Sequence, residues 1–503
     1  MALQNQYEDQ LENIENYIDK FARIDLSELN SFEKEVIDLV TKGEIDKAIA
    51  KYEDENLLSK YMTQIQEFKK LDDAQHLVSD ALDRSLERRD SIHRTIKHQV
   101  DLLRMAGGKS NFDKAMNLMR DVAMSDTTNF VAVFEYATYC RKVDRLSEAL
   151  YFYNIGLRNA VPNSHEAVQA RLGATNVLLR QREYYQVASS VYPILDIINE
   201  LSKQSGNPNL YIAERIDAKK LLARACTQLK DSINAKKYYT EAVNDCEVLV
   251  NMDSSQLILL AETECMASQM YIRAVSNPDE AIAIGKKALE HMLEAYNSNP
   301  ELYKAKYAFA QNTLASAYRH KRDFQLAEQH FLEADRLYTE AYKKNPEAYK
   351  SYLATNKQNM ADLYLYKDDE GNYPLIKKAL RYIQDSESLF KDLLKNGVES
   401  AELSLLYLDI NYVKYYFNTG QYDRALKYSN IAIEGIKPYY SKFPTTYKSL
   451  YIITLSNHLD ILDKLGKHKD AFEVFDRLIE VKPDEKIKEQ RDEYKAKYGD
   501  LTK

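Results

Sequence analysis

Alanines recur along this chain at a nearly constant interval, and this register limits what the chain can fold into. Ala281 and Ala327 are 46 residues apart, and most other steps have a similar length. An aromatic residue often stands four positions later and a small residue seven positions later, as Phe331 and Ala334 do. Small residues let antiparallel helices approach closely, so the register predicts a chain of similar helix hairpins. We name these residues the anchor alanines: Ala115, Ala149, Ala188, Ala235, Ala281, Ala327, Ala379, Ala425 and Ala471.

The segment from Asn299 to Leu337 is the clearest copy of the unit. It predicts two helices joined by a tight turn at Lys321–Asp323, with Ala327 at the centre of the second helix. Ala315 lies twelve residues before this anchor alanine, and Phe331 lies four residues after it. We therefore expect the two alanines to meet where the helices cross, with the aromatic ring filling the space beside them.

This pattern resembles the tetratricopeptide repeat (TPR) family, in which small, alanine, aromatic and small residues occupy four fixed positions. Two sets fit those positions: Ala137, Ala149, Tyr153 and Gly156, and Ala315, Ala327, Phe331 and Ala334. The spacing is mostly 46 residues rather than the family's usual figure of about 34. It is similar to the longer-helix repeats of bacterial TPR arrays and of kinesin light chain.

The resemblance covers roughly residues 91–503 and implies an all-α, TPR-type solenoid. In that fold antiparallel helix hairpins stack into a right-handed superhelix, and the first helix of each hairpin lines a concave face. Some positions depart from the pattern, and we expect distortion there, or a kink at the proline inside a second helix. These residues are Asn176, Pro193, Gln269, Gly285 and Ser429.

Composition supports a helical chain and disfavours one class of partner. Glycine and proline number only 13 and 10 in 503 residues, which favours long helices with few breaks. The net charge is −8, whereas a general nucleic-acid binder would carry a strong basic excess. The 39 tyrosines are expected either to fill space between helices or to make contacts in a groove.

The register divides the chain into four regions. Residues 1–55 form an N-terminal helical region with one degenerate hairpin, whose turn lies at Gly43. Residues 56–105 form a long helix or a helix pair, residues 106–482 the TPR array, and residues 483–503 a charged capping helix.

The second region and one insertion each leave two interpretations open. Apolar residues in 56–105 alternate at spacings of three and four, which suits either helices packed on the array or a coiled coil that forms a homodimer. Residues 367–378 lengthen one inter-helix turn, either as an interaction loop or as a neutral insertion.

The N-terminus has no signal-peptide pattern, and no apolar run approaches the length of a membrane span. We expect a cytoplasmic protein without membrane insertion, or a periplasmic one if the chain is part of an exported protein. The four cysteines, exemplified by Cys140 and Cys226 at equivalent positions, are expected to be buried core residues.

The sequence contains no pattern that supports catalysis. No Cys-x-x-Cys pair, Cys/His metal spacing, His-Glu-x-x-His or Gly-x-Ser-x-Gly motif occurs. Residues 106–110 are similar to the end of a phosphate-binding loop, but Leu103 stands where that loop needs glycine. We therefore predict a protein that is not an enzyme and binds no cofactor or metal.

Basic residues at one repeat position predict a stripe along the concave face. Arg141, Arg180, Arg273 and Arg319 each stand eight residues before an anchor alanine, and where Thr227 breaks this run Lys220 and Arg224 lie nearby. Guanidinium groups bind carboxylates and phosphates in bidentate fashion, so an acidic or phosphorylated segment would suit them. Alternatively, these cations only complement the dipole of a helix C-terminus.

Asparagines predict a second set of contacts. Asn359, Asn411 and Asn457 recur in the first helices of late repeats, and Asn312 and Lys414 are further candidates. In related TPR proteins an asparagine at this place often bonds the backbone of a bound peptide, which suits an amide with both donor and acceptor.

Two functions follow from these features. The first is a scaffold that binds a protein or peptide in the concave groove, with an acidic partner expected if the basic stripe takes part. The second is a regulatory sensor whose superhelix changes pitch when a peptide or other ligand binds. A sensor would need an effector module, which residues 1–105 would have to provide.

Overall fold

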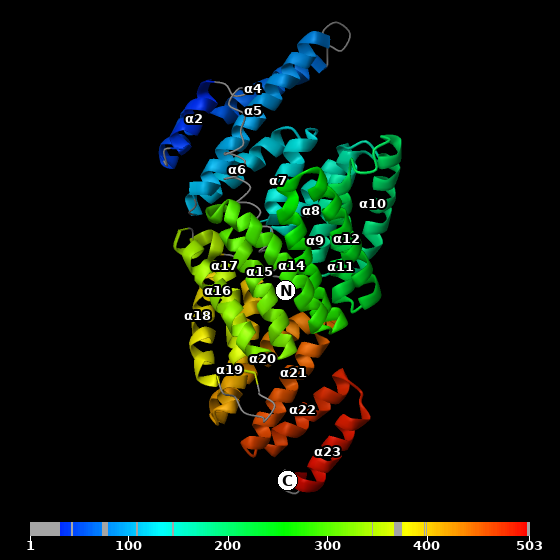
Figure 1. The fold of residues 1–503 in the computed structure, drawn as a ribbon, viewed down its shortest axis with the longest axis vertical. Helices are drawn as coiled ribbons and strands as arrows, with labels where there is room; N and C mark the ends of the chain where they lie inside the picture. Colours follow the sequence, from blue (N-terminus) through cyan, green and yellow to red (C-terminus); the bar gives the residue numbers. More distant parts are fainter. Residues whose placement is uncertain are drawn as a thin grey trace.

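The computed structural model describes residues 31–41, 44–72, 79–106, 109–142, 145–344, 346–366, 375–396, 398 and 400–499. Helices follow one another throughout these ranges, and the described residues form no strand (Figure 1). Several features expected from the sequence lie outside the described residues. They are the pieces before residue 31, the turn at Gly43, glycines 107 and 108, and most of the insertion at 367–378.

Five described helices precede residue 130, the fifth of which carries the anchor alanine Ala115 at the start of the predicted array, and one helix follows the array. The first five are α2 (Ser31–Thr41), α3 (Ile45–Asp54), α4 (Leu57–Asp72), α5 (Ser79–Ala106) and α6 (Lys109–Ser125). The last is α23 (Glu485–Tyr498).

The array alternates first and second helices of successive hairpins. The first helices are α7 (Phe130–Lys142), α9 (His165–Arg180), α11 (Ile212–Gln228), α13 (Leu257–Met270), α15 (Pro300–Lys321), α17 (Pro346–Tyr364), α19 (Ser400–Asn418) and α21 (Pro444–Lys464). The second helices are α8 (Leu146–Asn159), α10 (Tyr184–Gln204), α12 (Ser232–Met252), α14 (Pro278–Ser298), α16 (Phe324–Lys344), α18 (Ile376–Lys395), α20 (Tyr422–Lys442) and α22 (His468–Val481). Two short helices, η1 (Ser254–Gln256) and the π-helix η2 (Tyr271–Val275), flank α13.

Contacts between the helices establish a solenoid. Each helix from α4 onward packs on the next, and each first helix from α7 to α19 also contacts the first helix of the following hairpin. The first helices therefore form one continuous layer, and the second helices lie outside it. The array curves, so that α10 and α12 lie on one side of the view and α16 to α18 on the other (Figure 1). This arrangement confirms the all-α, TPR-type solenoid that the sequence predicts.

The hairpin core is built from the residues that define the register. Ala327, Phe331 and Ala334 are all fully buried in α16, and Ala315 is fully buried in α15. Removing a side chain as large as that of Phe331 from water stabilises the fold by roughly 1.5–3 kcal/mol. Small residues at the crossing and large ones beside it thus hold each pair of helices together.

The predicted register is wrong by one residue in α10. Ala188 is only partly buried and Tyr192 is 45% exposed, whereas Val187 and Val191 are fully buried. The branched aliphatic side chains form a stripe that continues to Ile198 and packs more completely than the one containing Ala188. Pro193 does not end the helix, which continues from Tyr184 to Gln204.

Two departures from the aromatic position have direct packing reasons. A Cβ atom at Gly285 would lie 3.3 Å from both Leu314 Cδ1 and Ser268 Oγ, so glycine lets α13, α14 and α15 approach closely. Ser429 is fully buried, and its hydroxyl lies 2.9 Å from Nδ1 of His458. Close approach and a hydrogen bond therefore replace the aromatic ring in these two hairpins.

Region 56–105 contains two helices rather than one. Tyr61 and Ile65 of α4 pack with Ile96, Val100 and Leu103 of α5 in a core that also includes residues of α3 and α6. The apolar face therefore packs within the chain. The homodimeric coiled coil stays a prediction.

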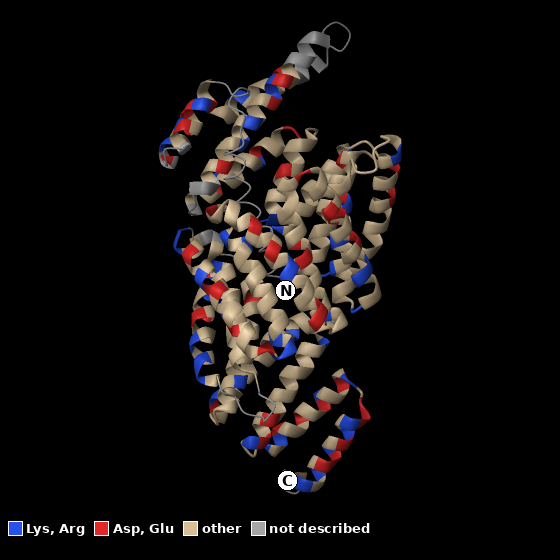
Figure 2. Ribbon diagram, viewed as in Figure 1, with Lys and Arg blue, Asp and Glu red and all other residues tan. Residues whose placement is uncertain are grey.

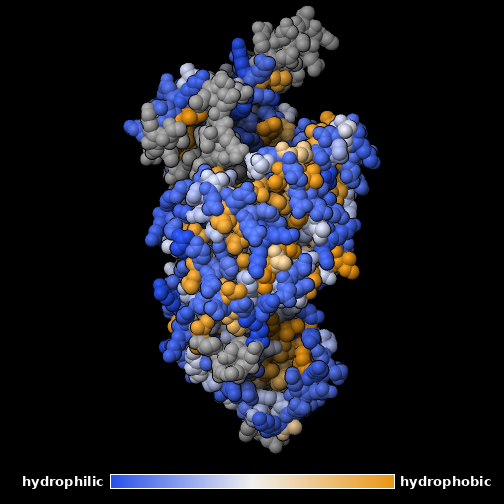
Figure 3. Space-filling model, viewed as in Figure 1, coloured by the Kyte–Doolittle hydropathy of each residue, from blue (hydrophilic) through white to orange (hydrophobic). Residues whose placement is uncertain are grey.

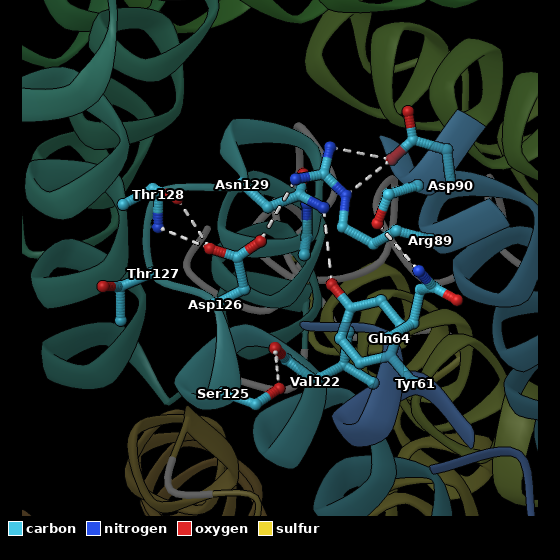
Figure 4. Close-up of polar contacts among 12 residues, drawn as sticks. Tyr61, Gln64, Arg89, Asp90, Val122, Ser125, Asp126, Thr127, Thr128 and Asn129 are labelled. Atoms are coloured by element: carbon cyan, nitrogen blue, oxygen red, sulfur yellow. Dashed lines mark hydrogen bonds and ion pairs between the residues drawn. The ribbon is translucent and has the colours of Figure 1, made fainter. Parts of the chain in front are cut away.

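A polar network joins this helix pair to the array (Figure 4). Arg89 of α5 lies between Asp90 and the buried carboxylate of Asp126, which follows α6 and is 3.3 Å from its Nη1. Asn129, in the same turn, donates a 3.4 Å hydrogen bond to the hydroxyl of Tyr61.

At the other end of the array, α23 packs on α22 through Tyr494.

Candidate functional site

A pocket of about 230 Å³ opens on the layer of first helices, where α13 with η2, α15, α17 and α19 lie side by side. Its walls carry amides, hydroxyls, aromatic rings and a small set of charged groups. Acidic and basic residues are interspersed along the helices in view (Figure 2). On the molecular surface seen from the same side, apolar side chains are mostly scattered, apart from a hollow near α21 and α22 (Figure 3).

Three asparagines in the pocket bond to one another. Asn312 of α15 donates a 2.7 Å hydrogen bond to Asn356 of α17 and accepts a 3.1 Å bond from Asn359. Asn356, which is fully buried, also donates to the backbone carbonyl of Phe331. These bonds fix the amide orientations and link two successive first helices.

Charged groups lie at the end of the pocket nearest the helix C-termini. Arg273 comes from η2, Arg319 and His320 from the last turn of α15, and Asp362 from the last turn of α17. Nη1 of Arg319 lies 3.5 Å from Oδ2 of Asp362 and donates to the backbone carbonyl of Asn359 at 3.4 Å. The long distance to Asp362 indicates a weak ion pair.

The histidine carries no charge at neutral pH. Desolvation in the concave pocket, together with the charges of Arg319 and Arg273, lowers the pKa of His320 to about 4. His320 therefore adds no positive charge to the two arginines beside it.

The structure brings four of the predicted binding residues into this pocket: Arg273, Asn312, Arg319 and Asn359. Asn411 of α19 adjoins it, because its Nδ2 donates a 2.7 Å hydrogen bond to Oδ1 of Asp362. Their role in binding stays a prediction.

Two other arginines of the predicted stripe bond within the array. Arg180 donates a 2.9 Å hydrogen bond to the backbone carbonyl of Arg141, and Arg141 donates a 3.3 Å bond to the hydroxyl of Tyr153. Both bonds join neighbouring helices, so these side chains stabilise the packing of the array. Lys220, Arg224, Lys414 and Asn457 do not line the pocket either. Lys414 is exposed, and the buried Nδ2 of Asn457 has no hydrogen-bond acceptor among the described residues.

The sequence did not indicate a contact that closes the curved array on itself. The guanidinium carbon of Arg182, in the turn after α9, lies 4.7 Å from the centre of the Tyr447 ring in α21. The two residues are 265 positions apart in the chain (447 − 182). We call this pair the closing contact.

The closing contact lies beside the pocket. Burial raises the pKa of Tyr407, a pocket-lining residue of α19, and the charges of Arg182 and Arg273 oppose that rise. Burial also raises the pKa of Tyr184, against the charges of Arg182 and Arg224. Arg182, from an early repeat, therefore acts on the same tyrosine, Tyr407, as Arg273 of the pocket.

The described part of the chain contains no group of three or more His, Cys, Asp or Glu residues that could hold a metal ion. None of its helices is both long enough and apolar enough to cross a membrane.

No protein-family model matches the chain, and no curated protein matches it. Among solved structures, it is similar to a Rap protein complexed with Competence and Sporulation Factor, at 12% identity and a TM-score of 0.40 over 86% of this chain and 99% of that one. It is also similar to the human IFIT1 dimer with PPP-AAAA, at 15% identity and 0.38 over 95% of each chain. BtubC from P. vanneervenii matches at 17% identity and 0.34, over 54% of this chain and 91% of that one. At these identities and scores the similarity carries no conclusion about function.

Proposed function

We propose that this chain is a non-catalytic scaffold that holds a segment of a partner protein or a peptide in the pocket between α13 and α19. The observation that carries the proposal is the pocket wall itself, in which amides, hydroxyls and aromatic rings converge from four first helices. Amides can bond a peptide backbone as donor and acceptor, and aromatic rings provide apolar contact area.

The pocket's size supports a segment rather than a whole small molecule. Sites that enclose a drug-sized ligand usually measure roughly 300–1,000 Å³, and this pocket measures about 230 Å³. It would accommodate one or two side chains of a longer segment that continues along the first helices. Because all four cysteines are buried and none of them forms a disulfide, we also propose that the partner is met in a reducing compartment, the cytoplasm.

One observation favours a ligand-responsive sensor as the second candidate. The closing contact joins the turn after α9 to α21 beside the pocket, so an occupant that displaced Arg182 or Tyr447 would let the array change its curvature. The helix pair α4–α5, joined to the array through Arg89 and Asp126, would then change position with it.

Peptide selection with a blocked pocket tests the scaffold. A random peptide library is selected on the wild-type chain and then counter-selected on Ser316→Trp, which adds an indole to a residue that lines the pocket. Ile431→Trp, at a side chain of α20 that is 45% exposed, is the matched control. We expect selected peptides to bind wild type and Ile431→Trp equally and Ser316→Trp weakly. Equal binding to all three proteins, or no enrichment, would contradict the proposal.

A further inference from the structure

The charged groups of the pocket wall already have partners within the chain. Nη1 of Arg319 lies 3.5 Å from Oδ2 of Asp362, and Oδ1 of the same carboxylate accepts a 2.7 Å hydrogen bond from Asn411. Arg273 also has an interaction partner within the chain, and His320 is neutral because its pKa is lowered to about 4. A charged occupant would therefore meet no unpaired opposite charge, and burying it would cost free energy.

A neutral group of the wall, by contrast, has unused hydrogen-bonding capacity. Ser404 of α19 lines the pocket and is only 4% exposed, yet its hydroxyl has no hydrogen-bond partner among the described residues. The hydroxyl of Ser316, on the same wall, donates a 3.0 Å bond to the backbone carbonyl of Asn312 in its own helix. Buried polar atoms are nearly always bonded, so the free hydroxyl of Ser404 favours a polar occupant that bonds to it.

Amide groups on two further helices add donors and acceptors. Gln358 of α17 lines the pocket, and its side chain makes no hydrogen bond to the described residues. Nδ2 of Asn359 donates to Asn312, which leaves the carbonyl oxygen of Asn359 unbonded. Gln269 of α13 uses only its Nε2, in a 3.4 Å bond to Thr313. These free groups of the described wall are therefore a whole amide and two carbonyl oxygens, all of them neutral.

We propose that the pocket takes a carboxamide side chain, that of glutamine or asparagine, from the partner segment. The inference rests on the proposed function, because it takes the same pocket as the binding site. A carboxamide is neutral and has two N–H donors and a carbonyl acceptor. It can therefore donate to the carbonyl oxygen of Asn359 and accept from the hydroxyl of Ser404. Phe309 and Tyr352 line the same pocket and offer apolar contact to the methylene groups that carry the amide.

Other side chains suit this wall less well. A carboxylate only accepts hydrogen bonds, so it would leave the carbonyl oxygens of Gln269 and Asn359 unbonded. An ammonium or guanidinium group only donates, and it would lie in a pocket that already holds Arg273 and Arg319. An aliphatic side chain would cover the hydroxyl of Ser404 without bonding it, which costs free energy. A hydroxyl side chain has one donor, against two in a carboxamide.

The peptides selected in the test of the scaffold give the first measurement. Peptides that bind wild type but not Ser316→Trp should share one position that is occupied by glutamine or asparagine. The best of them is then synthesised with glutamine, glutamate or leucine at that position, and its affinity for the full wild-type chain is measured by fluorescence anisotropy. We expect the glutamine peptide to bind about tenfold or more tightly than the other two. This comparison needs no variant to fold.

Variants then assign the preference to the wall. Ser404→Ala should weaken the preference for glutamine over leucine, and Gln358→Lys should turn the preference from glutamine towards glutamate, because it adds a cation. Ser202→Ala is the matched control. Ser202 of α10 is also a buried serine, 8% exposed, whose hydroxyl has no partner among the described residues, but it does not line the pocket. This variant should bind all three peptides as wild type does.

The outcomes separate this inference from the proposed function. Glutamate or leucine peptides that bind as tightly as the glutamine peptide would overturn the carboxamide site. Selected peptides without a shared carboxamide position, or a preference unchanged in both Ser404→Ala and Gln358→Lys, would do the same. The scaffold would stand in each of these cases, because the peptides would still depend on an open pocket. If no peptide is enriched, both proposals are rejected.

Discussion

The contact between Tyr153 and Gly173 determines how closely two neighbouring hairpins stack, and we predict that Gly173→Ala destabilises the array. A Cβ atom at this position of α9 would lie 2.2 Å from Cε1 and 2.4 Å from Cζ of the Tyr153 ring. The ring cannot easily move, because its hydroxyl lies 2.9 Å from Oγ1 of Thr138 and accepts a hydrogen bond from Arg141. It is also 1% exposed, so no adjacent solvent space can receive it.

The expected magnitude is the difference between two effects. Overpacking a close contact costs roughly 1–3 kcal/mol, and replacing glycine by alanine inside a helix returns roughly 0.5–1 kcal/mol. A Cβ atom only 2.2 Å from the ring places the overpacking cost in the upper half of its range, so Gly173→Ala should lower the free energy of unfolding by about 1–2.5 kcal/mol. Gly156→Ala is the control, since its Cβ would meet Phe130 Cε2 at 3.4 Å and Val133 Cγ1 at 3.8 Å, which are ordinary contacts. That variant should be as stable as wild type or slightly more stable.

Urea unfolding followed by far-ultraviolet circular dichroism measures the difference. Because hairpins of a solenoid can open separately, amide hydrogen exchange in α8 and α9 should localise the loss to the hairpins that meet at Gly173. If Gly173→Ala unfolds at the same urea concentration as wild type, or if both glycine variants lose equal stability, the close contact does not limit the stacking of these hairpins.

Three further predictions test other contacts. Ala327→Leu should cost roughly 1–3 kcal/mol, because Ala327 is fully buried between helices; an unchanged melting temperature would contradict this. Asn411→Ala should cost roughly 0.5–1.5 kcal/mol, because Asp362 loses a 2.7 Å hydrogen bond, and a variant as stable as wild type in urea would reject that bond. A hydrogen bond to Glu264 raises the pKa of His291, so the folded chain holds this proton more tightly than the unfolded chain. The stabilising effect of this proton is complete when the pH lies below the pKa of His291 in the unfolded chain, and it is lost as the pH rises through the raised pKa of His291 in the folded chain. The melting temperature should therefore fall more between about pH 6 and pH 8 in wild type than in His291→Gln. Parallel pH curves would refute it.

Local spacing explains why the hairpins could be predicted from the sequence. Ala327 and Phe331 lie on one face of one helix, and the partner Ala315 is only twelve residues away, so short-range periodicity contains the contact. The same reasoning failed in α10, where two apolar stripes one residue apart compete. Val187 and Val191 are buried in place of Ala188, because packing against neighbouring hairpins determines which stripe faces the core, and periodicity does not include that packing.

The candidate pocket likewise contains residues that the sequence indicated and residues that it did not. Asn312 and Asn359 are 47 residues apart, close to one repeat, so nearly equivalent positions on successive first helices meet, and the asparagine pattern in the sequence indicates this pair. Sequence reasoning found Asn312 and Asn359 but missed Asn356, which the structure shows to be fully buried between them. Only part of the predicted arginine stripe lines the pocket. Arg273 and Arg319 reach the pocket, whereas the guanidinium group of Arg180 bonds the backbone of the preceding first helix.

The closing contact lies beyond any argument from the repeat, for a geometric reason. Each hairpin adds a small rotation to the one before, and the position of Arg182 relative to Tyr447 is the sum of those rotations over the helices from α9 to α21. Irregular steps such as the π-helix at Tyr271–Val275 change that sum without changing the anchor alanines. Lys230 and Arg322 occupy the same left-handed turn position as Arg182, so the turn position alone does not select the arginine that approaches the pocket. The closing contact is therefore a product of curvature. A substitution that altered the rotation between two hairpins would separate Arg182 from Tyr447 while leaving every hairpin intact.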